Sequence, residues 1–182
     1  MRNVFDQYTQ PENRLTHAIA VALSESTTLR AAFMTDFLAT PAAVAARDTI
    51  VSSQTMPGSD TLDDEAEAER MGVPDLWLAH EETGWCAVFE NKLTAPFEPD
   101  QVRRHVRTAA RRGFSEIEPV VLACRAEPRA SEVGARSYSW REIHAWLRRQ
   151  TDAWAHRAAG YFETLEARMI ARDEELPSPL TG

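Results

Sequence analysis

The spacing of hydrophobic and polar residues along the chain predicts helices that alternate with strands. Apolar residues recur at helical spacing in five segments, which we expect to be helices: residues 11–24, 27–38, 100–112, 139–147 and 152–172. Apolar and β-branched runs bounded by turn residues predict four strands: residues 49–53, 73–80, 85–92 and 119–124. Strands interleaved with helices predict an α/β fold in which helices flank a central mixed sheet.

The two middle strands are predicted to form a hairpin, because residues 81–84 make a four-residue turn that ends in glycine. If these four residues are the loop, His80 pairs with Trp85, and the same register places Asp75 opposite Glu90. Directly opposite residues have Cβ atoms about 4.5–5.5 Å apart. The two-residue period of a strand also places Lys92 on the same face as Glu90. Two carboxylates and one ammonium are therefore expected at the open end of this hairpin.

Two carboxylates in opposite positions destabilise a sheet unless a cation lies between them. A divalent metal ion supplies that charge, and hard oxygen ligands favour Mg²⁺ or Mn²⁺ over zinc. Magnesium keeps coordination positions for water and phosphate, so the arrangement predicts phosphate chemistry. The alternative is a structural role, with Asp75 as a turn residue at a strand start and Glu90 and Lys92 as a surface ion pair.

Pro74-Asp75, followed after fourteen residues by Glu90-Asn91-Lys92, resembles the motif of the PD-(D/E)XK nuclease superfamily. The resemblance implies a restriction-endonuclease-like αβββαβ core over residues 11–124, with added C-terminal helices. It also implies that Asp75 and Glu90 bind the metal ion and that Lys92 activates or positions the attacking water. Further implied metal ligands are the backbone carbonyl of Asn91 and an acid on the first helix, here Glu12. The helix dipole alone also favours a glutamate in the first turn, so Glu12 has a structural alternative.

The helix that follows the motif carries two more candidate features. In the exonuclease-like branch of the superfamily a glutamine, followed four residues later by tyrosine, lies beside the active site. Gln101 matches this glutamine as a further catalytic residue, whereas His105 stands in place of the tyrosine. An arginine face on the same helix is a candidate for binding nucleic-acid phosphates, or else a solvated surface: Arg103, Arg104, Arg107 and Arg111.

Composition limits the other possibilities. The net charge of −8, from 28 acids and 20 bases, excludes a protein that coats DNA through overall charge. Lys92 is the only lysine of the chain, which draws attention to the motif that contains it. No apolar run approaches the ~20 residues of a membrane span, and the first residues lack the apolar region of a secretory signal. Two cysteines, Cys86 and Cys124, are expected to be buried free thiols. We therefore expect a cytoplasmic protein that does not bind membranes.

The function predicted from the sequence is metal-dependent hydrolysis of nucleic acid, with DNA favoured and Mg²⁺ or Mn²⁺ as the cofactor. Residues 1–150 are expected to form the nuclease-like domain, and residues 151–182 a helix and tail that pack on it or extend it. The resemblance suggests restriction, repair or defence, in a homodimer or a larger complex. One alternative is a catalytically inactive nucleic-acid-binding or scaffold subunit. Another is an interaction module that uses the acidic run at residues 60–69.

Overall fold

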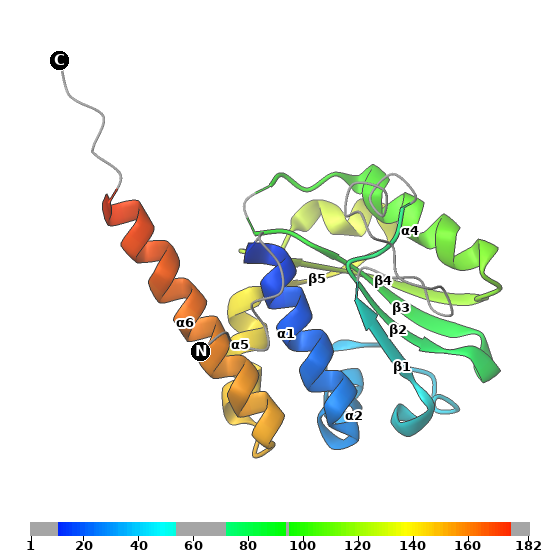
Figure 1. The fold of residues 1–182 in the computed structure, drawn as a ribbon. Coiled ribbons are helices and arrows are strands. Elements are labelled where there is room, and N and C mark those ends of the chain that lie inside the picture. The colour runs from blue at the N-terminus through cyan, green and yellow to red at the C-terminus, as the bar shows by residue number, and fades with distance from the viewer. Residues whose placement is uncertain (1–10, 54–71, 94, 176–182) are drawn as a thin grey trace.

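A five-stranded sheet forms the centre of the protein (Figure 1). The computed structural model describes residues 11–53, 72–93 and 95–175, with side chains for residues 13–53, 72–93 and 95–166. Within these ranges the strands are β1 (Ile50–Ser53), β2 (Leu76–His80), β3 (Trp85–Asn91), β4 (Glu116–Ala123) and β5 (Arg136–Ser139). The α-helices are α1 (Pro11–Glu25), α2 (Thr27–Phe37), α4 (Pro99–Arg111), α5 (Trp140–Arg149) and α6 (Ala153–Glu175). The acidic run at residues 60–69 lies outside the described residues.

The sheet is open and mixed, and its strands lie in chain order. Strands β1, β2 and β3 pair antiparallel, whereas β3, β4 and β5 pair parallel. A parallel pair needs a crossover connection, and α4 provides it between β3 and β4. The predicted α/β class and the mixed sheet flanked by helices are confirmed.

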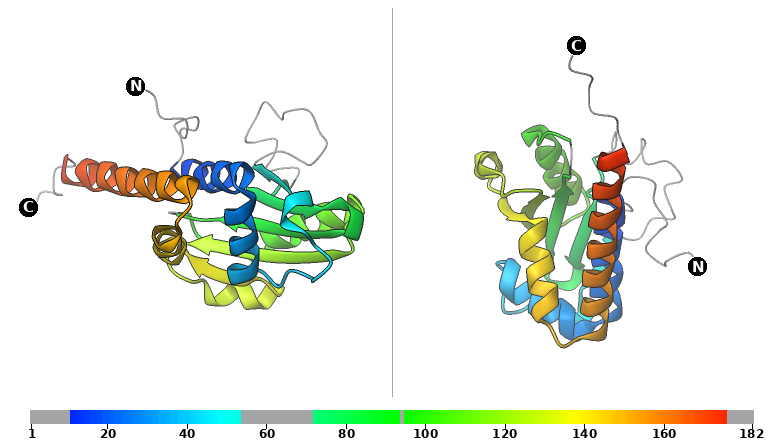
Figure 2. Two further views of the ribbon diagram at one scale, coloured as in Figure 1. Left: turned by 90° about the horizontal axis from the view of Figure 1, so that it is seen from below. Right: turned by 90° about the vertical axis from the view of Figure 1, so that its left-hand side faces the viewer.

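Helices cover both faces of the sheet (Figures 1 and 2). The larger core lies between one face and α1, α2, α5 and α6, where alternate strand residues such as Leu76, Leu78 and Phe89 point. The residues between them, including Trp77 and Val88, pack on the other face against Ala109 of α4. Every residue of β2 and β3 is buried, because both faces of these strands are covered. Their sequences are therefore nearly continuous hydrophobic runs, whereas a strand with one exposed face would alternate hydrophobic and polar residues.

Strand β5 was not predicted, because its sequence Arg-Ser-Tyr-Ser has no apolar run. Its residues pair only with Val120 to Ala123, so the first half of β4 has no partner on that side. This explains how Pro119, which lacks an N–H group, is accommodated inside a strand next to β3. Only the pairing with β4 makes residues 136–139 a strand.

The C-terminal helices are as predicted. Ser139 and Glu142 form the predicted capping box at the start of α5, each side chain accepting a hydrogen bond from the other residue's backbone N–H. Helix α6 packs its first four turns against the larger core through Ala158, Tyr161 and Leu165. Its far end projects beyond the sheet (Figure 2).

The two cysteines differ in their surroundings. Cys86 is buried, as expected, and burial raises the pKa of its thiol to about 12. Cys124 is exposed, so the expectation of a second buried thiol is wrong. The reason is that β4 ends at Ala123, and the chain leaves the core at the next residue.

Candidate active site

The open end of the β2–β3 hairpin holds the residues of the motif. The predicted register is confirmed from His80 and Trp85 to Leu76 and Phe89, where the regular pairing ends. One position further, the Asp75 N–H donates to the Phe89 carbonyl (3.0 Å), and the Asp75 carboxylate accepts from the Asn91 N–H (2.7 Å). Asp75 therefore contacts the residues on both sides of Glu90, and its backbone does not pair with that of Glu90 as the simple register predicts.

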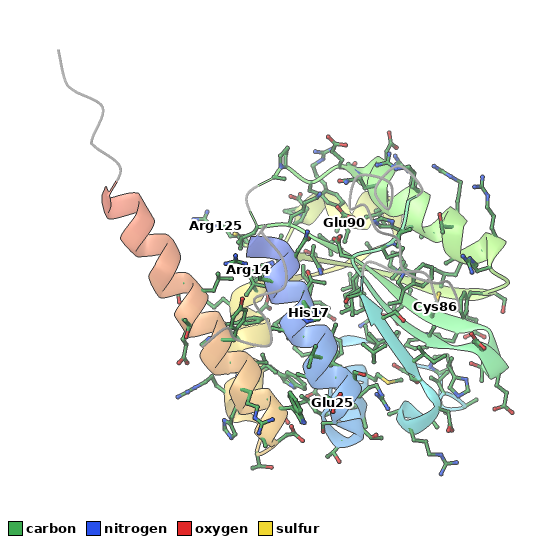
Figure 3. The ribbon with its side chains drawn as sticks, viewed as in Figure 1. Arg14, His17, Glu25, Cys86, Glu90 and Arg125 are labelled. Atoms are coloured by element: carbon green, nitrogen blue, oxygen red, sulfur yellow. The ribbon has the colours of Figure 1, made fainter. Side chains whose placement is uncertain are left out.

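Asp75 and Glu90 lie on the face of the sheet that α4 covers. Strand alternation places them with Trp77 and Val88, which pack against α4. Asp75 is half-buried, whereas Glu90 is only 3% exposed. In Figure 3, Glu90 and Cys86 mark the two ends of β3, with Glu90 at the end nearer α1. A buried glutamate needs partners that satisfy both its charge and its hydrogen bonds.

The first partner of Glu90 is Lys92. The ammonium of Lys92 lies 2.7 Å from Glu90 Oε1, and both side chains are largely buried. The backbone of Lys92 is fixed as well, since its N–H donates to Leu122 (2.7 Å) and its carbonyl accepts from the Trp140 indole (3.1 Å). The only lysine of the chain is thus a buried partner of the motif glutamate, which excludes the surface ion pair considered as the structural alternative.

The second partner of Glu90 is His105, for which the sequence predicts no role at the site. The Nε2 atom of His105 lies 2.5 Å from Glu90 Oε2, and Nδ1 lies 3.0 Å from the Gly72 carbonyl oxygen. A carbonyl oxygen can only accept, so Nδ1 carries a proton and donates a hydrogen bond to the Gly72 carbonyl. One feature of the sequence could have indicated that His105 belongs to the site. It follows Gln101 by four residues, which places both side chains on the same side of α4.

Charge and burial shift the pKa values of this cluster in different directions. Burial raises the pKa of Asp75 to about 7; the negative charge of Glu90 adds to the rise, and the Asn91 N–H opposes it. Burial would also raise the pKa of Glu90, but the hydrogen bonds and charges of His105 and Lys92 outweigh it and lower the pKa. For His105 burial favours the neutral ring, yet its bond to Glu90 raises the pKa. Glu90 and His105 therefore form a charged pair, and Asp75 is the carboxylate that lacks sufficient positive charge.

Asn91 and Glu12 are the remaining proposed metal ligands. The N–H and C=O of a strand residue point to the same edge, so the Asn91 carbonyl faces the Asp75 side as its N–H does. The Asn91 side chain points to the other face, where its amide donates to Thr16 of α1 (2.6 Å). The backbone of Glu12 belongs to the first turn of α1, but its side chain lies outside the described residues.

Helix α4 presents the other predicted residues. Gln101 is buried, one turn before His105. The side chains of Arg103, Arg107 and Arg111 are exposed, whereas Arg104 is half-buried. Arg103 also forms an ion pair with Asp100 at 2.6 Å. Three of the four predicted arginines thus lie on a solvent-exposed surface of the helix that covers the acidic cluster.

Gly72 brings the chain close to α4 just before Asp75. Its φ of +71° favours glycine, and a Cβ atom would lie 3.1 Å from Arg104 Cβ and 3.3 Å from Thr108 Oγ1. We expect Gly72→Ala to lower the free energy of unfolding by about 2–4 kcal/mol, from the positive φ and the overpacking together. Gly134→Ala is the matched control, because φ there is +67° and nothing lies within 4 Å. Urea unfolding of both variants tests this, and equal losses would show that the close approach to α4 costs nothing.

Comparisons with models of protein families, with curated proteins and with solved structures gave no match for this chain. In the part of the chain with described side chains, no three or more His, Cys, Asp or Glu residues are grouped so that they could hold a metal ion. No described helix is both long enough and apolar enough to cross a membrane. Any functional assignment must therefore be argued from the Asp75, Glu90 and Lys92 cluster itself.

Proposed function

We propose that this chain is a metal-dependent nuclease of the PD-(D/E)XK type, with a restriction-endonuclease-like core and DNA as the favoured substrate. The observation that carries the proposal is the meeting of Asp75, Glu90 and Lys92 at one end of the β2–β3 hairpin, with the Lys92 ammonium 2.7 Å from Glu90. A purely structural ion pair would not require a second acid beside it. Burial raises the pKa of Asp75, and the neighbouring charge of Glu90 adds to the rise, as expected where two acids share one site.

The residues present fit a divalent cation. Asp75, Glu90 and the Asn91 carbonyl offer hard oxygen atoms, which suit Mg²⁺ or Mn²⁺, and Glu12 is the candidate for a further ligand. A carboxylate oxygen has two acceptor sites, so Glu90 Oε1 can accept from Lys92 and still bind a cation while Oε2 accepts from His105. Such an ion polarises a phosphate and lowers the pKa of a bound water.

The protein side chains then have separate roles. Lys92, held by Glu90 and by the hydrogen bonds of its backbone, positions the attacking water or neutralises charge that develops on the phosphate. A lysine suits this role because its ammonium is a compact charge with a tunable pKa, whereas arginine stays protonated. Gln101, which is buried on α4, is the candidate for a further residue beside the site.

The exposed arginines of α4 are proposed to bind phosphates that flank the scissile bond. We expect Arg103→Ala with Arg107→Ala to weaken DNA binding and to reduce the slope of log K against log salt by about 2, or about 1 for each lost phosphate contact. Arg148→Ala with Arg149→Ala, on the exposed side of α5, is the matched control. A titration of duplex DNA at several salt concentrations measures both slopes, and an unchanged slope in the α4 variant would reject this surface.

The direct test of the proposal is incubation of the full chain with linear, circular and single-stranded DNA in Mg²⁺ or Mn²⁺. We expect cleavage that requires the metal ion and that Lys92→Ala reduces by at least about 10²-fold. Cleavage of the circular substrate would identify an endonuclease. An equal rate with the Lys92→Ala protein would contradict the proposal.

A second candidate function is a catalytically inactive nucleic-acid-binding subunit. The observation that favours it is that both oxygens of Glu90 have protein partners, Lys92 and His105. In the same assay this candidate predicts DNA binding that depends on the α4 arginines, without metal-dependent cleavage.

A further inference from the structure

Two hydrogen bonds connect the backbone before Asp75 to the carboxylate of Glu90. His105 Nδ1 donates to the Gly72 carbonyl (3.0 Å), and His105 Nε2 donates to Glu90 Oε2 (2.5 Å). Because the Glu90 and His105 side chains are both nearly inaccessible to water, neither bond competes with solvent. His105 thus joins to helix α4 both β3, which carries Glu90, and the segment that leads into Asp75.

The local structure allows His105 little freedom. Gly72 lies so close to α4 that a Cβ atom there would meet Arg104 and Thr108. This close approach places its carbonyl within reach of the imidazole. With Nδ1 held by Gly72, the ring plane and the direction of Nε2 are fixed. The Glu90 carboxylate is fixed in turn, with Oε2 toward His105 and Oε1 toward Lys92.

We propose that His105 is a positioning residue that holds Oε2 of Glu90, so that a metal ion binds this carboxylate through Oε1, and that His105 thereby favours Mg²⁺ and Mn²⁺ over Ca²⁺. This inference rests on the proposed function, because it concerns the same candidate metal site. It extends that function by naming the residue that sets the selectivity of the site for its cation.

The chemical reason lies in how these ions bind carboxylates. Ca²⁺ takes six to eight oxygen ligands and often binds both oxygens of one carboxylate. Mg²⁺ needs near-ideal octahedral geometry, which suits a carboxylate that contributes one oxygen. A partner that orients a metal ligand from behind is often worth 10–100-fold in metal affinity. Holding Oε2 by His105 therefore disfavours the binding mode that Ca²⁺ uses.

Two conservative variants separate positioning from packing. In His105→Gln the side-chain amide reaches the position of Nε2, so it keeps a donor for Glu90. In His105→Asn the amide reaches only the position of Nδ1, so it keeps the contact with Gly72 and loses the contact with Glu90. Both are amides, and neither adds bulk to the core. His144→Gln is the matched control, because His144 pairs with Glu163 (3.2 Å) at the surface.

The experiment titrates the full-length, metal-free protein with Mg²⁺, Mn²⁺ and Ca²⁺ at one fixed pH and follows binding by calorimetry and thermal shift. We expect His105→Asn to weaken Mg²⁺ and Mn²⁺ binding by about 10–100-fold. Its Ca²⁺ binding should weaken much less, so that the preference for Mg²⁺ falls. His105→Gln should recover most of the preference, and His144→Gln should match the wild type.

The outcomes separate this inference from the proposed function. If the wild type binds Mg²⁺ but His105→Asn keeps the wild-type ratio of Mg²⁺ to Ca²⁺ affinity, the role of His105 is overturned and the nuclease proposal stands. If His105→Gln loses the preference as fully as His105→Asn, the effect is one of packing and the positioning role is wrong. If the wild type binds none of the three ions, both proposals fail.

Discussion

Replacing Asp75 by asparagine is expected to abolish metal-dependent cleavage and at the same time to stabilise the metal-free protein above pH 7. Asparagine keeps an oxygen that accepts from the Asn91 N–H, but it removes the charge that a metal ion would bind. Burial and the charge of Glu90 raise the pKa of Asp75 from 3.8 to about 7. Folding therefore disfavours the ionised form of the Asp75 carboxylate, which is the form that would bind a metal ion.

The sign of the pH dependence follows from this raised pKa. Below pH 4, Asp75 is protonated in both the folded and the unfolded chain, and its contribution to folding is intact. Between pH 4 and 7 the unfolded chain ionises first, so the free energy of unfolding of the wild type falls, by up to about 4 kcal/mol in total. In Asp75→Asn the side chain does not ionise, so the free energy of unfolding does not fall from this cause between pH 4 and 7.

Urea unfolding in EDTA at pH 5 and pH 8 measures the effect. We expect Asp75→Asn to gain stability relative to the wild type as the pH rises. With Mg²⁺ present, only the wild type should gain stability from the ion, because only it binds the ion tightly. A variant less stable than the wild type at pH 8 would show that Asp75 has a structural role and would weaken the case for a metal site.

Replacing Glu90 by glutamine is expected to lower the free energy of unfolding by about 3–5 kcal/mol, because two buried cations then lose the anion between them. Lys92 and His105 both donate to Glu90, whose side chain is 4% exposed. Glu163→Gln is the matched control: Glu163 also contacts a histidine and a basic residue, His144 and Arg148, but its side chain is 48% exposed. There we expect a loss below about 1 kcal/mol.

A double-mutant cycle sharpens this prediction. In the Glu90→Gln background Asp75 is the only described carboxylate that remains beside Lys92 and His105, both of which favour its charged form. Asp75→Asn should then destabilise the protein at pH 8, although it stabilises the wild type. Coupling of this kind between residues in one network is typically about 0.5–3 kcal/mol. Additive effects would show that the two acids do not share one electrostatic site.

Much of the fold could be predicted because it is encoded by local patterns. The apolar spacing of α1 and α4 and the capping box of α5 indicated helices whose observed bounds differ by only one or two residues. The four-residue turn before Trp85 fixed the hairpin register. Strand β5 could not be predicted, since its residues have no strand pattern of their own and depend on β4 for pairing.

The sequence by itself determined that this is an α/β protein and that Asp75, Glu90 and Lys92 meet at one end of a hairpin, because periodicity and turn length are local properties. Only the tertiary structure decided what surrounds them. His105 contacts Glu90 because α4 crosses back over the sheet, and Gly72 allows that approach. Burial in the folded chain also raises the pKa of Asp75, since the cost of removing a charge from water depends on packing that no local pattern encodes.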